Sequence, residues 1–98
     1  MNEEAYGLKQ HVIEEIIDAA RAHGIHKLIL FGSRAKNRHS RASDIDLAVY
    51  GGDAAGFAAE AEESVQTLLR FDITDMSGCI SPDFRRQIEE GIVLYEKI

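Results

Sequence analysis

The chain has 98 residues, of which 45% are hydrophobic and 29% are charged, as is usual for a globular protein. Domains typically contain about 100–150 residues, so we expect a single domain spanning residues 1–98. The net charge of −6 argues against nonspecific nucleic-acid binding, which requires a basic face.

The first half of the chain predicts a helix followed by two strands. Apolar residues at helical spacing predict an amphipathic helix from about Tyr6 to His23, ended by Gly24 in a left-handed conformation. The apolar run Lys27–Phe31 predicts a buried strand that stops at Gly32-Ser33. A basic loop, with a short helical turn at its start, then leads to an alternating strand over residues 44–50.

The second half predicts two helices and two strands. Asp53 is the expected N-cap of a helix running to about Leu69, whose buried stripe would be Phe57, Ala61, Val65 and Leu68. Residues 71–74 predict a strand, and Ser81-Pro82-Asp83 predicts the start of a helix that ends at Gly91. Residues 92–95 complete the pattern as a last strand.

Alternating strands and helices predict an α/β (α+β) fold, a small mixed β-sheet with its helices on one face. Side chains of a strand alternate between the two faces of a sheet. Ile45, Leu47 and Val49 would therefore face the helices, and Asp44 and Asp46 would lie on an open face. That face is free for a ligand.

Asp44 and Asp46 are the first candidate site residues. Two parallel carboxylates repel each other, so a cation must offset them, and Mg²⁺ suits because it takes one or two protein carboxylates together with water and substrate phosphate. An alternative is that they simply pair with Arg38 or Arg41. Asp72 is expected on the same open face as a third carboxylate, and Asp75 is expected to be a turn or cap residue.

Gly32-Ser33 lies between a strand and a possible helical turn, where backbone N–H groups and a hydroxyl can donate to a phosphate. Charge segregation points the same way. Residues 19–43 contain six basic and no acidic residues, whereas residues 42–84 contain nine carboxylates and one basic residue, Arg70. Either a phosphate-holding loop lies beside a metal-holding cluster, or solvated charges are segregated by chance.

Three segments now carry a resemblance: Phe31-Gly32-Ser33-Arg34-Ala35, Ser43-Asp44-Ile45-Asp46-Leu47-Ala48-Val49 and Phe71-Asp72-Ile73. Together they resemble the polymerase-beta-like nucleotidyltransferases. More closely, the chain resembles the minimal nucleotidyltransferases, which are antitoxins paired with HEPN-domain ribonuclease toxins. The closing segment, residues 80–96, is similar to the end of that family's sequences, so the resemblance covers nearly the whole chain.

The resemblance implies a role for each residue of the motif. Gly32 and Ser33 would hold the triphosphate of ATP or another nucleoside triphosphate, and Asp44 and Asp46 would ligate Mg²⁺, with two ions expected. Asp72 would complete the metal site and accept the proton of the attacking hydroxyl. Basic loop residues would offset charge on the leaving pyrophosphate: Arg34, Lys36, Arg38 and Arg41. Asn37 stands where the family often has glycine, and asparagine also tolerates a left-handed backbone.

Three functions fit these features. The leading one is a Mg²⁺-dependent nucleotidyltransferase that moves AMP to a tyrosine of a HEPN toxin, which is AMPylation by an antitoxin. The second is a non-catalytic nucleotide-binding antitoxin or regulatory subunit that masks its partner. The third is transfer to a small molecule such as an aminoglycoside, although 98 residues leave little chain to enclose such an acceptor.

Location and the remaining reactive residues give simpler expectations. Met1-Asn2-Glu3-Glu4 lacks an apolar signal segment, no apolar run approaches the roughly 20 residues that span a bilayer, and Cys79 is the only cysteine. We therefore expect a cytoplasmic protein with no membrane partner and a structural cysteine. The four histidines lack metal-ligand spacing and are expected at the surface or at helix ends: His11, His23, His26 and His39.

Overall fold

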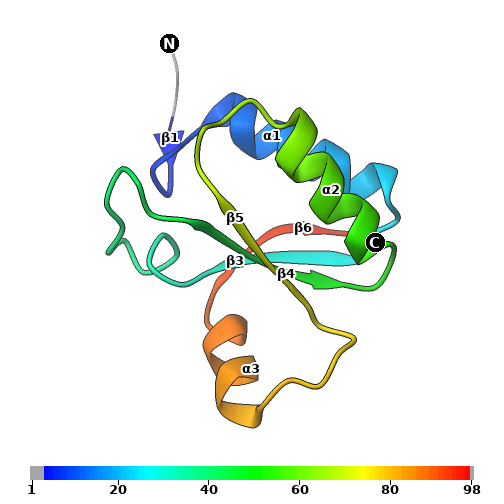
Figure 1. Ribbon diagram of the computed structural model, residues 1–98. Helices are drawn as coiled ribbons and strands as arrows, with labels where there is room; N and C mark the ends of the chain where they lie inside the picture. The colour runs from blue at the N-terminus through cyan, green and yellow to red at the C-terminus, as the bar shows by residue number, and fades with distance from the viewer. Residues whose placement is uncertain (1–3, 98) are drawn as a thin grey trace.

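The computed structural model describes residues 4–97 (Figure 1). The elements follow in the order β1 (Glu4–Ala5), β2 (Leu8–Lys9), α1 (Gln10–Ala22), β3 (Lys27–Phe31), β4 (Ile45–Tyr50), α2 (Ala54–Ser64), β5 (Phe71–Asp75), α3 (Pro82–Glu89) and β6 (Ile92–Glu96). The predicted α/β class is confirmed. Residues 1–3, which belong to the segment on which the expectation of no signal sequence rests, lie outside the described residues. None of the helices within residues 4–97 is long and apolar enough to cross a membrane.

The main sheet has four strands in the order β5-β4-β3-β6. β3 pairs antiparallel with both β4 and β6, whereas β4 and β5 run parallel, so the sheet is mixed as expected. β4 and β5 run in the same direction and begin at the same end of the sheet, because Ile45 is the register partner of Phe71. The starts of these two strands therefore place the aspartates side by side.

α1 and α2 pack together on one face of the sheet (Figure 1). The predicted periodicity of α1 is confirmed, and its buried side chains are Val12, Ile13, Ile16, Ala19 and Ala20. The helix begins later than predicted, at Gln10, because Tyr6 and Gly7 both have positive φ angles, of 60° and 73°. They form the two-residue turn between β1 and β2, and positive φ at both central residues is the requirement of a type I′ turn.

α3 lies on the opposite face of the sheet, so the prediction that all helices share one face is wrong in this respect (Figure 1). Ile88 of α3 is fully buried in a second apolar cluster with Ile29, Phe31 and Ala48. The ring of Phe31 also meets that of Phe84 edge-on, with centroids 5.6 Å apart. The physical reason lies in β3, whose apolar residues occupy both faces, and a strand that is apolar on both sides is normally covered on both.

α2 ends at Ser64, five residues before the predicted end at Leu69. Val65 is already extended, with φ −73° and ψ 125°, and the next backbone N–H, that of Gln66, donates to the carboxylate of Glu15 on α1. The predicted stripe is buried at Phe57, Ala61 and Val65, but Leu68 is fully exposed. Other end signals are confirmed: Asp53 caps α2, Ser81 caps α3, and Gly24 has a φ of 68°.

Candidate active site

Asp46 on β4 and Asp72 on β5 are direct register partners in the parallel pair. Ile73 packs into the cluster beneath α1 and α2, so its neighbour Asp72 points to the opposite face, which it shares with Asp46 and Ala48. Asp44, which directly precedes β4, is exposed, as is Asp72, whereas Asp46 is half-buried. The structure thus brings the three predicted carboxylates to one end of the sheet, beyond the part that α3 covers.

The electrostatics of Asp46 reflect this crowding. Its pKa is raised first by partial burial and then by the negative charges of Asp72 and Asp44, while the positive charge of Arg34 acts in the opposite direction. A half-buried carboxylate with two like-charged neighbours is destabilised in its ionised form. A bound cation would relieve that repulsion, so the charge pattern favours cation binding here.

The fit to Mg²⁺ rests on the chemistry of the donors. Among residues 4–97, no three His, Cys, Asp or Glu side chains are already arranged as a metal-binding group. Mg²⁺ does not need such a cage, because it is commonly held by one or two carboxylates and completes its octahedron with water and substrate phosphate. Asp46 with Asp44 or Asp72 supplies the hard oxygen ligands for that mode of binding. These residues therefore fit Mg²⁺ bound together with a phosphate-bearing substrate.

Gly32 lies next to this cluster because it follows Phe31, the register partner of Asp46. Its φ is 77°, a conformation that L side chains rarely adopt, and a Cβ atom on it would collide with Oδ2 of Asp46. The position therefore requires glycine for two reasons, its backbone conformation and its contact with a candidate metal ligand. The sequence indicated only a possible phosphate-binding turn at this glycine.

The loop after Gly32 contains the expected helical turn. The N–H of Lys36 donates to the carbonyl of Gly32 at 3.2 Å, and the N–H of Arg38 donates to that of Ser33 at 2.8 Å. Asn37 ends the turn with a φ of 56°. This is a Schellman arrangement, in which a left-handed residue closes a helical turn. The expectation that Asn37 can adopt a left-handed backbone in place of glycine is confirmed. Ser33, which follows Gly32, is half-buried.

Arg34 differs from its prediction as a phosphate ligand. Its side chain is 1% exposed, and its guanidinium donates to the backbone carbonyls of Ser43, at 2.7 and 3.3 Å, Tyr6, at 3.1 Å, and Gly7, at 3.2 Å. Burial lowers the pKa of Arg34, and the nearby negative charge of Asp46 opposes that shift. The predicted direct contact with phosphate is therefore wrong. Arg34 instead joins two segments through its hydrogen bonds: Ser43, the residue before Asp44 in the basic loop, and the turn at Tyr6 and Gly7 between β1 and β2.

The other basic and acidic candidates separate more simply. Lys36, Arg38 and Arg41 are exposed on the loop, so their contact with pyrophosphate stays a prediction. Asp75, at the end of β5, accepts hydrogen bonds from the N–H and hydroxyl of Ser77, at 3.0 and 2.7 Å, and these bonds lower its pKa. This agrees with the expectation that Asp75 is a turn residue and that Asp72 is the residue facing the site.

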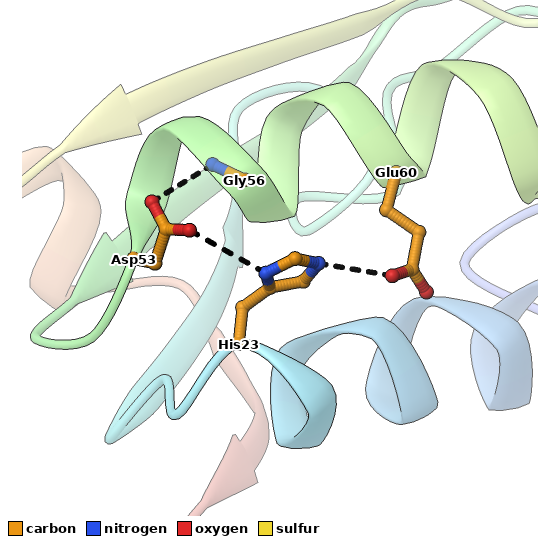
Figure 2. A network of polar contacts seen from close by, with 4 residues as sticks. All are labelled: His23, Asp53, Gly56 and Glu60. Carbon is orange, nitrogen blue, oxygen red and sulfur yellow. Dashed lines mark hydrogen bonds and ion pairs between the residues drawn. The ribbon is translucent and has the colours of Figure 1, made fainter.

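His23 has a structural role (Figure 2). At the end of α1, its Nε2 lies 2.9 Å from Oε1 of Glu60, and its Nδ1 lies 3.6 Å from Oδ2 of Asp53. Asp53 also accepts the N–H of Gly56 at the start of α2. This network joins the end of α1 to α2 on the helix-covered face of the sheet, which is not the face that carries Asp46 and Asp72. A structural role of this kind is expected for a helix-end histidine.

Comparison with known proteins decides the family. The family model for polymerase beta nucleotidyltransferases matches residues 14–98. The chain belongs to this nucleotidyltransferase family. The match includes both strands with the aspartates, the Gly32-Ser33 turn and α3, so the fold and the class of enzyme that the sequence motifs predicted are confirmed.

Solved structures agree with the fold of this nucleotidyltransferase. A crystal structure of a toxin–antitoxin with AMP-PNP matches with a TM-score of 0.69 and 23% identity, over 87% of this chain and 73% of that chain. A mutant of the MntA–HpeT toxin–antitoxin matches with a TM-score of 0.68 and 21% identity, over the same shares of the two chains. A search of the curated proteins found no match.

Proposed function

We propose that this nucleotidyltransferase is the antitoxin of a toxin–antitoxin pair and transfers AMP from ATP to a hydroxyl of its partner, a tyrosine of a HEPN-domain toxin. The observation that carries the proposal is the register pairing of Asp46 with Asp72 beside Gly32. The half-buried Asp46, which its two carboxylate neighbours repel, and the exposed Asp72 thus lie next to the turn expected to hold the triphosphate. The toxin–antitoxin structures that share this fold, one of them with AMP-PNP, support the partner class and the donor.

The reaction can be written from the residues of the chain. The acceptor hydroxyl attacks the α-phosphorus in line, forming the new P–O bond while the bond to pyrophosphate breaks. Asp72 accepts the hydroxyl proton, and Gly32 and Ser33 orient the phosphates. Asp44 and Asp46 would hold Mg²⁺, two ions as the resemblance implies, which supplies charge neutralisation at the phosphate oxygens. Exposed loop residues, Arg41 among them, offset charge on the leaving pyrophosphate.

The alternative is a non-catalytic nucleotide-binding antitoxin or regulatory subunit that masks its partner, and masking without a bound nucleotide explains less of the site. A protein that only covers its partner gains nothing from Asp72 in register with Asp46, because the added repulsion is a cost unless a cation or proton is bound there.

We further propose a cytoplasmic location, which agrees with a free, exposed thiol at Cys79.

Calorimetric titration with Mg·ATP tests the site directly. We expect the double variant Asp44→Asn/Asp46→Asn to lose binding, because the amides cannot replace the charged oxygen ligands of Mg²⁺. Asp75→Asn is the matched control, since it changes a carboxylate on the same sheet that is engaged with Ser77. Equal binding by the double variant and the wild type would contradict the proposed site.

A further inference from the structure

A cleft of about 520 Å³ lies beside the start of α1, against the segment 65–70 that joins α2 to β5. The buried side chains of Leu8 and Val12 line it together with the half-buried Leu69, and the exposed Lys9 and Arg41 border it. None of the residues that line the cleft is acidic, in a chain of net charge −6. The cleft therefore combines an apolar interior with a cationic margin.

Leu68, which also borders this cleft, is fully exposed at 104% of its reference surface. The segment that carries it is held by hydrogen bonds. Gln66 N–H donates to Glu15 at 2.9 Å, and Leu69 N–H donates to the hydroxyl of Thr67 at 3.2 Å. A single exposed leucine is ordinary, but this one stands on a held segment beside an apolar cleft. The two features together form one outward-facing apolar surface.

This surface adjoins the candidate active site. Arg34 bonds both to Gly7, which lines the cleft, and to Ser43, which precedes Asp44. On the other side, the N–H of Ile45 donates to the carbonyl of Arg70 at 2.8 Å, joining the end of the segment to the start of β4. In Figure 1 the segment passes the start of α1 and then runs down into β5. A molecule bound in the cleft would lie beside the end of the sheet at which the aspartates are placed.

We propose that this cleft docks the protein acceptor through an amphipathic segment of the acceptor, with apolar side chains in the cleft and acidic side chains beside it. The inference rests on the proposed function in that the acceptor is taken to be a protein. Two observations favour a protein over a small ligand. Leu68 lines the cleft but is fully exposed, so a small molecule inside the cleft would contact only part of it, whereas a protein surface covers the cleft and the outward face of Leu68 together. The cationic margin formed by Lys9 and Arg41 complements acidic residues.

The test measures the affinity of the whole chain for the purified product of the adjacent gene, the candidate acceptor, by isothermal titration calorimetry. We expect Leu68→Asp to weaken binding by at least about tenfold, as burying an aspartate at an apolar anchor would. Leu68→Ala should fall between that variant and the wild type. Val93→Asp is the matched control, because Val93 is 47% exposed on β6, at the other edge of the sheet. Lys9→Glu should weaken binding and reduce its dependence on salt.

Mg·ATP affinity, measured on the same variants, separates this inference from the proposed function. The docking proposal predicts that Leu68→Asp leaves Mg·ATP affinity unchanged, and a loss would overturn it by assigning the cleft to the nucleotide. Unchanged acceptor binding by Leu68→Asp, an equal loss in Val93→Asp, or no binding by the wild type would also overturn it. If binding depends on Leu68 but no AMP is transferred, the docking surface stands and the proposed activity fails.

Discussion

Replacing Arg34 by alanine tests whether this residue holds the site together or binds the substrate. The guanidinium donates to the carbonyls of Tyr6, Gly7 and Ser43, so its removal leaves three acceptors without their donor. An acceptor left unsatisfied costs about 1–3 kcal/mol. Tyr6 and Ser43 are only half-buried and Gly7 is exposed, so water can reach their carbonyls once the Arg34 side chain is removed, and we take the lower end for each. The expected loss in the free energy of unfolding is therefore about 3 kcal/mol.

For a domain of this size, 1 kcal/mol corresponds to about 4–8 °C in Tm, so Arg34→Ala should melt at least about 12 °C lower than the wild type. Thermal and urea unfolding followed by circular dichroism measure this. Arg41→Ala is the control, since an exposed side chain of the same loop should change stability by less than about 0.5 kcal/mol. An Arg34→Ala protein with unchanged Tm but lost Mg·ATP binding would refute the structural role and restore the phosphate role.

Three further changes test the fold and the site. Gly32→Ala should cost about 1–2 kcal/mol for its left-handed backbone and also weaken Mg·ATP binding by displacing Asp46, whereas Gly24→Ala, with similar φ and open space, should cost stability only; calorimetry with both variants checks this. The raised pKa of Asp46 means that the folded chain holds this proton more tightly than the unfolded chain, so its contribution to stability falls as pH rises above about 3.8. In EDTA, Asp46→Asn should therefore match the wild type near pH 3 and exceed its stability at neutral pH, and equal urea curves at both pH values would contradict the crowding. Ile88→Ala should destabilise the chain by about 2–5 kcal/mol in urea unfolding, as expected for a fully buried side chain beneath α3, and a loss below about 1 kcal/mol would contradict its burial.

The parts of the fold that local patterns encode could be predicted from the sequence. β3 lies at the predicted residues because an apolar run between Gly24 and Gly32 is too short for a helix and is best buried as a strand. The alternation of β4 correctly predicts that Asp46 and Leu47 lie on opposite faces of the sheet. The same reasoning on β5 selects Asp72, and not Asp75, as the carboxylate that shares a face with Asp46. Asn37 was recognised as a residue able to take a left-handed backbone. In each case the signal lies within a few residues of the feature that it predicts.

The errors concern contacts between segments distant in sequence. The sequence predicts a free cation at Arg34, because no residue close to it in sequence indicates that its guanidinium bonds to the carbonyls of Tyr6, Gly7 and Ser43. The end of α2 is set by a bond from Gln66 to Glu15 on another helix, so the apolar Leu68 extended the predicted stripe too far. One missed feature did have a local signal, because Tyr6-Gly7 between two short segments is compatible with a two-residue hairpin turn.

Intact-mass spectrometry of the acceptor tests the central claim most directly. The product of the adjacent gene is incubated with the chain, Mg²⁺ and each nucleoside triphosphate in turn. We predict that ATP raises the acceptor mass by one or more AMP units. The increase should be absent with Asp44→Asn/Asp46→Asn and present with Asp75→Asn. An acceptor that binds the chain but keeps its mass with every nucleotide, or that is modified equally by the double variant, would contradict the claim that these aspartates form the active site of an AMP-transferring antitoxin.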